Sequence, residues 1–172
     1  MGTLSLATHA EQTFMTPLDG VRRLYERHSE TVYRSALRVT GNPADAEDVM
    51  QTVFMRVLHQ DTPPDPETTP SSYFRRAATN ASLDILRRRT SRNEAPLEEG
   101  FGRASPESPA VLREQIRRAL GQLDPMDAEL FLLRFVEGMS NGELAELYGA
   151  EKAQIAMRIY KIRQQLQQEL DR

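Results

Sequence analysis

The chain has 172 residues and contains no cysteine, so disulfides, thiolate metal sites and cysteine nucleophiles are excluded. Its formal net charge of −3 does not by itself indicate a nucleic-acid partner. The three histidines (His9, His28 and His59) are scattered without metal-ligand spacing, and we expect them at the surface. No run approaches the ~20 apolar residues of a membrane span, and the N-terminus lacks the pattern of a signal peptide. We therefore expect a cytoplasmic protein with no membrane insertion.

Helical apolar spacing throughout the sequence predicts an all-α fold. A first helix over residues 19–40 is expected to end at Gly41. Asn42 and Pro43 supply the N-cap and the first residue of a second helix, over residues 43–59. The buried face of this second helix is expected to comprise Ala46, Met50, Val53, Phe54 and Val57.

Four prolines in residues 61–70 predict an extended loop, and a third helix is expected over residues 71–89. Residues 91–110 are rich in Ser, Pro, Gly and Glu and lack periodicity, which predicts a flexible linker. A further helix is expected over residues 111–122. The predicted organisation is two small helical domains, with an N-terminal tail at 1–18, the domains at 19–90 and 111–172, and the linker at 91–110.

The C-terminal part shows the pattern of two helices joined by a tight turn. Asp124 and Pro125 open a helix, Ser140 and Glu143 then fit a capping box, and Gly149 supplies the permissive backbone of a sharp turn. The next helix has a predicted buried stripe of Ile155, Ile159, Ile162 and Leu166, with the cations Arg158, Lys161 and Arg163 off the stripe. This arrangement is typical of a helix-turn-helix that reads the DNA major groove. An ordinary helical hairpin with a solvated basic face is the alternative.

Charge is distributed unevenly along the chain. Residues 71–92 hold six arginines against one acid, Asp84, whereas residues 93–110 hold four glutamates against one arginine. A basic helix attracts phosphate, and its aromatic residues Tyr73 and Phe74 can stack on unpaired bases. A core position for both rings, with the arginines at a solvated helix end, explains the same residues.

The second helix carries three polar residues, Asp45, Asp48 and Gln51, at spacing i, i+3, i+6, roughly along one stripe. Acids near a helix start also offset the helix dipole. These residues alone therefore do not distinguish a binding face from a solvated one.

Three segments, in this order and spacing, resemble the extracytoplasmic-function (ECF) bacterial sigma factors: DAEDVMQTVF, SSYFRRAATNASLDILRRR and LRFVEGMSNGELAELYGAEKAQIAMRIYKIRQQL. The resemblance implies sigma region 2, a helical bundle, joined by a linker to sigma region 4, a helix-turn-helix domain. It also implies a transcription-initiation factor that binds core RNA polymerase, recognises −35 and −10 promoter elements with separate domains, and promotes strand opening. Its partners would be double-stranded promoter DNA and single-stranded −10 DNA.

By the same resemblance, Asp45, Asp48 and Gln51 contact the clamp helices of the polymerase β′ subunit, and region 4 contacts the β flap. Thr52 stands where many relatives carry Glu. The implied −10 contacts are Tyr73, Arg76, Asn80, Arg87 and Arg88, and relatives usually have Trp at the position of Tyr73. The implied −35 contacts are Arg134, Ala156, Met157, Arg158, Tyr160 and Lys161. The usual TVKSR pattern is replaced by QIAMR, so the target sequence is not predicted.

No phosphate-binding loop, metal cluster or nucleophile–base pair is apparent, so we expect no catalytic activity, cofactor or metal. Two alternatives are a stand-alone helix-turn-helix regulator and an adaptor that binds only proteins. The first usually needs a dimer, for which the chain has no obvious helix, and the six-arginine segment argues against the second. The linker acids Glu94, Glu98 and Glu99 fit either a nucleic-acid mimic or a plain tether. The sequence leaves open whether an anti-sigma factor binds the chain.

Overall fold

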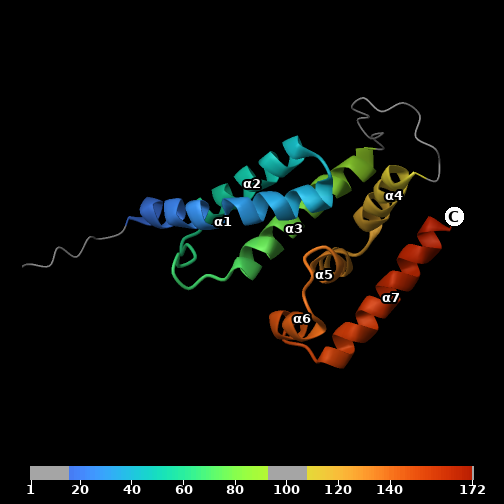
Figure 1. The fold of residues 1–172 in the computed structure, drawn as a ribbon. Coiled ribbons are helices and arrows are strands. Elements are labelled where there is room, and N and C mark those ends of the chain that lie inside the picture. Colours follow the sequence, from blue (N-terminus) through green and yellow to red (C-terminus); the bar gives the residue numbers. More distant parts are fainter. Residues whose placement is uncertain (1–15, 93–107, 172) are drawn as a thin grey trace, which may run out of the picture.

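The computed structural model describes residues 16–92 and 108–171, and these residues form seven α-helices and no strand. In chain order the helices are α1 (Pro17–Thr40), α2 (Pro43–Leu58), α3 (Ser71–Arg92), α4 (Pro109–Gln122), α5 (Pro125–Phe135), α6 (Asn141–Tyr148) and α7 (Lys152–Leu170). Figure 1 shows α1, α2 and α3 as one bundle, with α4 to α7 on one side of α3. The predicted all-α fold is confirmed. The predicted tail and linker lie largely outside the described residues.

Local capping chemistry sets the helix ends of the first bundle. The Asn42 side chain caps α2 by accepting hydrogen bonds from the backbone N–H groups of Ala44 (2.8 Å) and Asp45 (3.2 Å). Gly41 ends α1 with a φ of 68°, a left-handed conformation that glycine adopts without steric cost. Both features are as predicted. A capping box between Thr16 and Asp19, not predicted from the sequence, begins α1.

The core of the first bundle corrects two expectations. Val49 is buried on α2, whereas Met50 is only half-buried, because the buried positions of this helix follow Ala46, Val49, Val53 and Val57. Met50 therefore packs at the edge of the core, and the fully buried Val49 beside it was missed. His28, expected at the surface, is 3% exposed and stacks on Phe74 with 4.3 Å between ring centroids. Its position on α1 faces the bundle core.

Helices α4 to α7 form a second unit around the helix-turn-helix. The Ser140 Oγ accepts a hydrogen bond from the Glu143 N–H (3.2 Å), and the Glu143 carboxylate accepts one from the Ser140 N–H (2.8 Å). Gly149 ends α6 with a φ of 60°. The predicted stripe of α7 is buried at all of its positions: Ile155, Ile159, Ile162 and Leu166. The predicted capping box, glycine turn and buried stripe are confirmed.

Helix α3 is shared by the two units. Its Phe74 and Ala81 belong to the core with α1 and α2. Its Leu83 and Leu86, together with Val39 at the end of α1, belong to the core of the second unit. The two units therefore pack against each other through α3 in this structure.

Candidate polymerase and nucleic-acid interfaces

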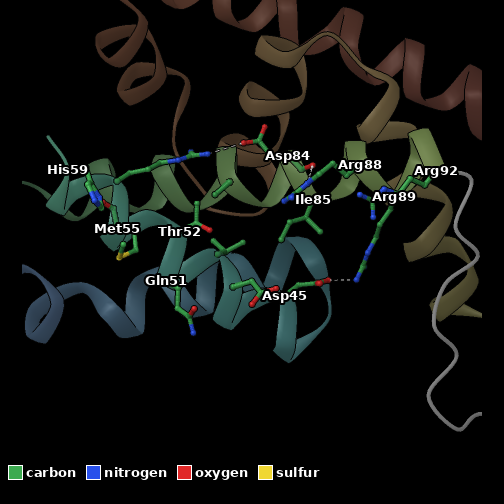
Figure 2. Close-up of a pocket in the computed structure, with 14 residues that line it drawn as sticks. Asp45, Gln51, Thr52, Met55, His59, Asp84, Ile85, Arg88, Arg89 and Arg92 are labelled. Carbon is green, nitrogen blue, oxygen red and sulfur yellow. Dashed lines mark hydrogen bonds and ion pairs between the residues drawn. The ribbon is translucent and has the colours of Figure 1, made fainter.

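An open groove of about 760 Å³ runs between α2 and α3 (Figure 2). Its α2 wall carries the exposed residues Asp48, Gln51 and Thr52. Its α3 wall carries the guanidinium groups of Arg88 and Arg89. The exposed part of the predicted α2 stripe is therefore accessible to a partner.

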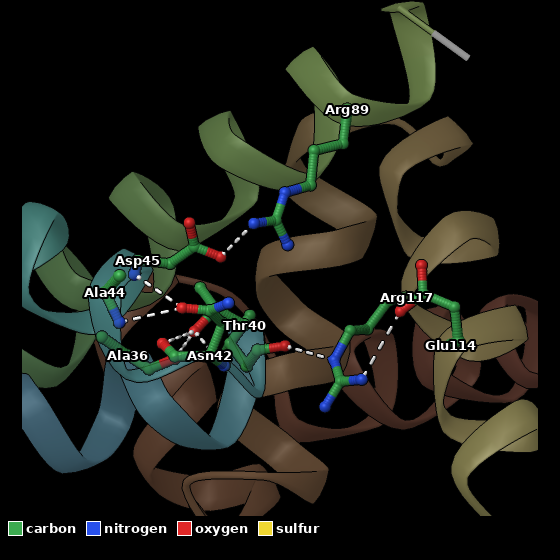
Figure 3. Close-up of polar contacts among 9 residues, drawn as sticks. Ala36, Thr40, Asn42, Ala44, Asp45, Arg89, Glu114 and Arg117 are labelled. Carbon is green, nitrogen blue, oxygen red and sulfur yellow. Dashed lines mark hydrogen bonds and ion pairs between the residues drawn. The ribbon is translucent and has the colours of Figure 1, made fainter. Parts of the chain in front are cut away.

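Asp45 differs from Asp48 and Gln51 because it contacts a residue inside the fold. Its Oδ2 lies 2.6 Å from Nη2 of Arg89 (Figure 3), and its side chain is 15% exposed. Burial raises the pKa of Asp45 above its usual value, although the neighbouring Arg89 acts in the opposite direction. Asp45 therefore joins α2 to α3, while the other two members of the stripe point to solvent.

Tyr73 and Asn80 lie two helical turns apart on α3 and are both half-buried. The Tyr73 ring meets Phe74 edge-on, with 5.1 Å between ring centroids. Its hydroxyl accepts a hydrogen bond from Nε2 of Gln60 (3.2 Å). Phe74 is fully buried, so the core interpretation is correct for Phe74, whereas Tyr73 borders both core and solvent.

The three arginines of α3 that the resemblance assigns to −10 DNA point to different places. Arg76 donates a hydrogen bond to the carboxylate of Glu129 on α5. Arg88 lines the α2–α3 groove and donates to the backbone carbonyl of Asp84 (3.2 Å), and Arg87 lies 3.9 Å from the Asp84 carboxylate. Arg76 thus contacts the second unit.

The outer face of α7 exposes four of the residues assigned to −35 DNA: Ala156, Met157, Tyr160 and Lys161. A groove of about 630 Å³ runs beside them. Arg158 is half-buried, and its Nε donates to Oδ1 of Asp127 (2.5 Å) while its Nη2 lies 3.8 Å from Asp124. Arg134 lies on α5 instead, half-buried, with its guanidinium 5.6 Å from the centroid of the Phe135 ring.

The sequence reasoning missed two buried glutamates. The side chains of Glu129, on α5, and Glu137, just after α5, are 10% and 1% exposed, and both lie against arginines of the first bundle. The one signal in the sequence is the position of Glu129 within AELFLL, where a charged residue interrupts an apolar run. A charge at such a position is buried only with a partner.

Two family models match the chain. The model described as sigma-70 region 2 matches residues 24–92, and the model described as sigma-70, region 4 matches residues 113–166. The ECF RNA polymerase sigma factor SigE of Mycolicibacterium smegmatis is 31% identical over 173 residues, covering 96% of this chain and 66% of SigE. The chain belongs to the ECF RNA polymerase sigma factors.

A second relative of this sigma factor is the ECF RNA polymerase sigma factor SigL of Mycobacterium tuberculosis, 27% identical over 166 residues. That match covers 93% of the chain and 90% of SigL. A solved structure of an RsbN–BldN complex is 23% identical to this chain. The match covers 88% of this chain and 91% of that chain, with a TM-score of 0.32.

Sigma factors are transcription factors without catalytic activity of their own. Within residues 16–92 and 108–171, no helix is both long and apolar enough to cross a membrane.

Proposed function

We propose that this sigma factor binds core RNA polymerase through α2, reads −35 DNA with α7 and holds the opened −10 strand on α3. The observation that carries the proposal is the exposure of one face on each of two helices whose opposite faces are buried. One is the Asp48–Gln51 face of α2, and the other is the outer face of α7. Packing does not use these side chains, so they are accessible to partners.

The proposed polymerase contacts are Asp48 and Gln51. An exposed carboxylate and an amide in one groove can accept hydrogen bonds from cationic side chains of a docked helix. Asp45 has a different task in this proposal, because its pair with Arg89 holds α2 against α3 and so keeps the docking face in place. Thr52, exposed in the same groove, contributes no charge to it.

The proposed −10 surface is the part of α3 around Tyr73 and Asn80. An aromatic ring that is already fixed by packing loses little conformational freedom when a base stacks on it. Phe74 fixes the Tyr73 ring in this way. Arg87 and Arg88, further along α3, would neutralise phosphates of the same strand.

The proposed −35 surface is the outer face of α7. Lys161 can contact a phosphate or a guanine edge, and Ala156 and Met157 offer apolar contacts to thymine methyl groups. Arg158 lies at the edge of this face, held by Asp127. Arg134, on α5, is proposed as a backbone phosphate contact.

A charge reversal on α2 tests the proposal. Asp48→Arg should weaken pull-down with core polymerase by about tenfold and lower run-off transcription, because it puts a cation where a carboxylate docks. Glu30→Arg is the matched control, since it reverses an exposed acid on α1, outside the proposed docking face. Equal core binding by the two variants, with unchanged circular dichroism, would remove the α2 face from the mechanism.

A further inference from the structure

The guanidinium of Arg158 lies against two carboxylates at the start of α5. Its Nε donates to Oδ1 of Asp127 (2.5 Å), and its Nη2 lies 3.8 Å from Oδ1 of Asp124. Its Nη1 donates to the sulfur of Met126 (3.0 Å), a weak acceptor. The guanidinium is therefore held by one turn of α5, which fixes both its position and its plane.

Both carboxylates are themselves fixed by α5. Oδ1 of Asp124 accepts a hydrogen bond from the Met126 N–H (2.9 Å) and so caps the helix. Asp127 lies in the first helical turn, where the helix dipole favours a negative charge, and its side chain is 23% exposed. Neither acid can follow Arg158 if that side chain moves away from α5.

This cluster borders the proposed −35 surface. Asp127 and Arg158 both line the groove of about 630 Å³ beside α7, together with Met157 and Lys161. The Arg158 side chain is 43% exposed, so DNA that enters the groove can reach its guanidinium. Asp127 takes the donor on Nε, and the Nη1 and Nη2 groups carry further donors.

The charges of the cluster favour a base over a phosphate as the partner of Arg158. Two carboxylates beside one guanidinium leave a net negative charge at this end of the groove. A phosphate that approaches Arg158 is therefore repelled by the acids as well as attracted by the cation. A base edge carries no net charge, and guanine presents two acceptors, N7 and O6, that match the paired donors of a guanidinium.

The fixed position of the guanidinium also favours discrimination between bases. An arginine that is ordered before binding loses little conformational freedom when it meets its base. If Arg158 turned toward another base, it would give up its bond to Asp127 and leave that half-buried carboxylate without this partner. Asp127 therefore opposes other directions of the Arg158 side chain.

An ion pair that only joins α5 to α7 is the alternative. Leu133 of α5 and Ile159 of α7 already belong to one buried core, so the two helices are held together by apolar packing. A partly exposed ion pair adds little to such packing. The two interpretations predict different effects on base discrimination.

We infer that Asp127 is a positioning residue that directs Arg158 to a guanine edge, so that the −35 element has a G·C pair opposite Arg158. Asp124 contributes through its charge, by disfavouring phosphate at the same place. Lys161, exposed in the same groove, remains available for phosphate. The inference rests on the proposed function of α7 and adds one base to a target that the QIAMR segment leaves open.

The test measures discrimination between bases. The probe is a fluorescein-labelled duplex that carries a −35 element selected by the holoenzyme. In a set of matched duplexes, each G·C pair of that element is changed singly to A·T, and an unrelated duplex of the same length reports binding without specificity. Fluorescence anisotropy gives the affinity of the full-length sigma factor and its variants for each duplex.

Wild type should lose about tenfold in affinity at a G·C pair that Arg158→Ala no longer distinguishes from A·T. Asp127→Asn keeps an acceptor for Nε but removes the charge. Its discrimination at the same pair should fall severalfold, while its binding to the unrelated duplex becomes tighter. Asp124→Asn retains an N-cap, because Asn caps helices as well as Asp does, and it should also bind the unrelated duplex more tightly. Glu146→Gln is the matched control, since it removes an exposed acid from α6 and should leave the discrimination unchanged.

Several results would overturn the inference. One is an Asp127→Asn protein that keeps the wild-type discrimination, or that binds every duplex more weakly by the same factor, as a structural role requires. Another is an Arg158→Ala protein whose affinity falls equally for all duplexes, which is the behaviour of a phosphate contact. Circular dichroism checks the folding of each variant, and if Asp127→Asn loses helix content, Arg158→Ala and Asp124→Asn decide the matter. If wild type binds the selected and unrelated duplexes equally, the proposed −35 role of α7 is itself wrong.

Discussion

Arg89 of α3 and Asp45 of α2 close one end of the α2–α3 groove, with 2.6 Å between Nη2 and Oδ2. The two helices have different proposed tasks, polymerase docking for α2 and DNA binding for α3. The pair fixes the orientation of one surface relative to the other. Burial raises the pKa of Asp45 despite the nearby guanidinium, so desolvation is the larger of the two effects on this carboxyl group.

Loss of the guanidinium should therefore destabilise the first bundle in a pH-dependent way. Arg89→Ala leaves the Asp45 carboxylate half-buried without its partner, and we expect the free energy of unfolding near pH 7 to fall by about 1–2 kcal/mol. A carboxyl whose pKa is raised by folding binds its proton more readily in the folded state. The deficit should therefore shrink as the pH falls from neutral through the raised folded-state pKa of Asp45, and be gone by the usual carboxyl pKa of 3.8.

Urea unfolding of wild type and Arg89→Ala across this pH range measures the effect. Asp45→Asn is the matched control, because the amide carries no charge to desolvate and does not titrate. A deficit of Arg89→Ala that is the same at neutral and acid pH would show that Asp45 is not its cause.

His28 should make the first bundle sensitive to mild acid. It is buried against Phe74, and neither of its ring nitrogens has a hydrogen-bond partner among the described residues. Burial lowers the pKa of His28 below 6.5, so the unfolded chain takes up a proton at this site at higher pH than the folded chain does. The free energy of unfolding is therefore highest above the pKa of His28 in the unfolded chain, and it decreases as the pH falls below that pKa.

His28→Phe keeps an aromatic ring at this position and removes the titration. We expect the variant to lose part of the decrease in unfolding free energy between about pH 7 and pH 5. His59→Gln, at an exposed position on the same bundle, should retain the wild-type pH dependence. Urea unfolding at several pH values compares the three proteins. Identical pH profiles for wild type and His28→Phe would show that His28 does not cause the acid sensitivity.

The features predicted correctly from the sequence depend on near neighbours in the chain. The Asn42 cap, the Ser140–Glu143 capping box and the Gly149 turn each involve residues a few positions apart. The buried stripe of α7 follows from helical periodicity on one helix with one buried face. Such features can be predicted from a short stretch of sequence, because the interacting residues lie within a few positions of each other.

The features that were missed depend on distant partners. Helix α3 packs into two cores, so its apolar residues form no single stripe from which its surroundings could be predicted. The partner of Arg76 is Glu129, 53 residues later in the chain, and the sequence therefore suggested a solvent-facing cation. His28 was expected at the surface although it shares one face of α1 with Leu24 and Val32, and its stacking partner Phe74 lies on another helix.

Lys161 and Arg158 should affect −35 binding differently. Lys161 is exposed on α7, so Lys161→Ala should weaken binding to duplex −35 DNA and reduce the salt slope by about one unit, with no change in thermal stability. Arg158 also pairs with Asp127, so Arg158→Ala should in addition lower the melting temperature.

Fluorescence anisotropy at several salt concentrations, with duplex DNA selected by the holoenzyme, measures both effects. Arg118→Ala is the matched control, since it removes an exposed cation from α4 instead of α7. If the salt slope of Lys161→Ala equals that of Arg118→Ala, Lys161 makes no phosphate contact.

Tyr73 should act in strand opening rather than in the first contact with duplex DNA, because base stacking requires an unpaired base. Tyr73→Ala removes a platform worth about 1–3 kcal/mol per stacked base, so closed complexes should form normally while permanganate reactivity of −10 thymines falls. Tyr73→Phe is the matched control, since it keeps the ring and removes only the hydroxyl that accepts from Gln60. Tyr73→Trp, with a larger ring, should open promoters at least as well as wild type.

The half-buried Tyr73 ring also packs beside Phe74, so circular dichroism must show that the Tyr73→Ala protein is folded. A folded variant that opens DNA normally, or a variant that unfolds because the ring is structural, would each refute the stacking role.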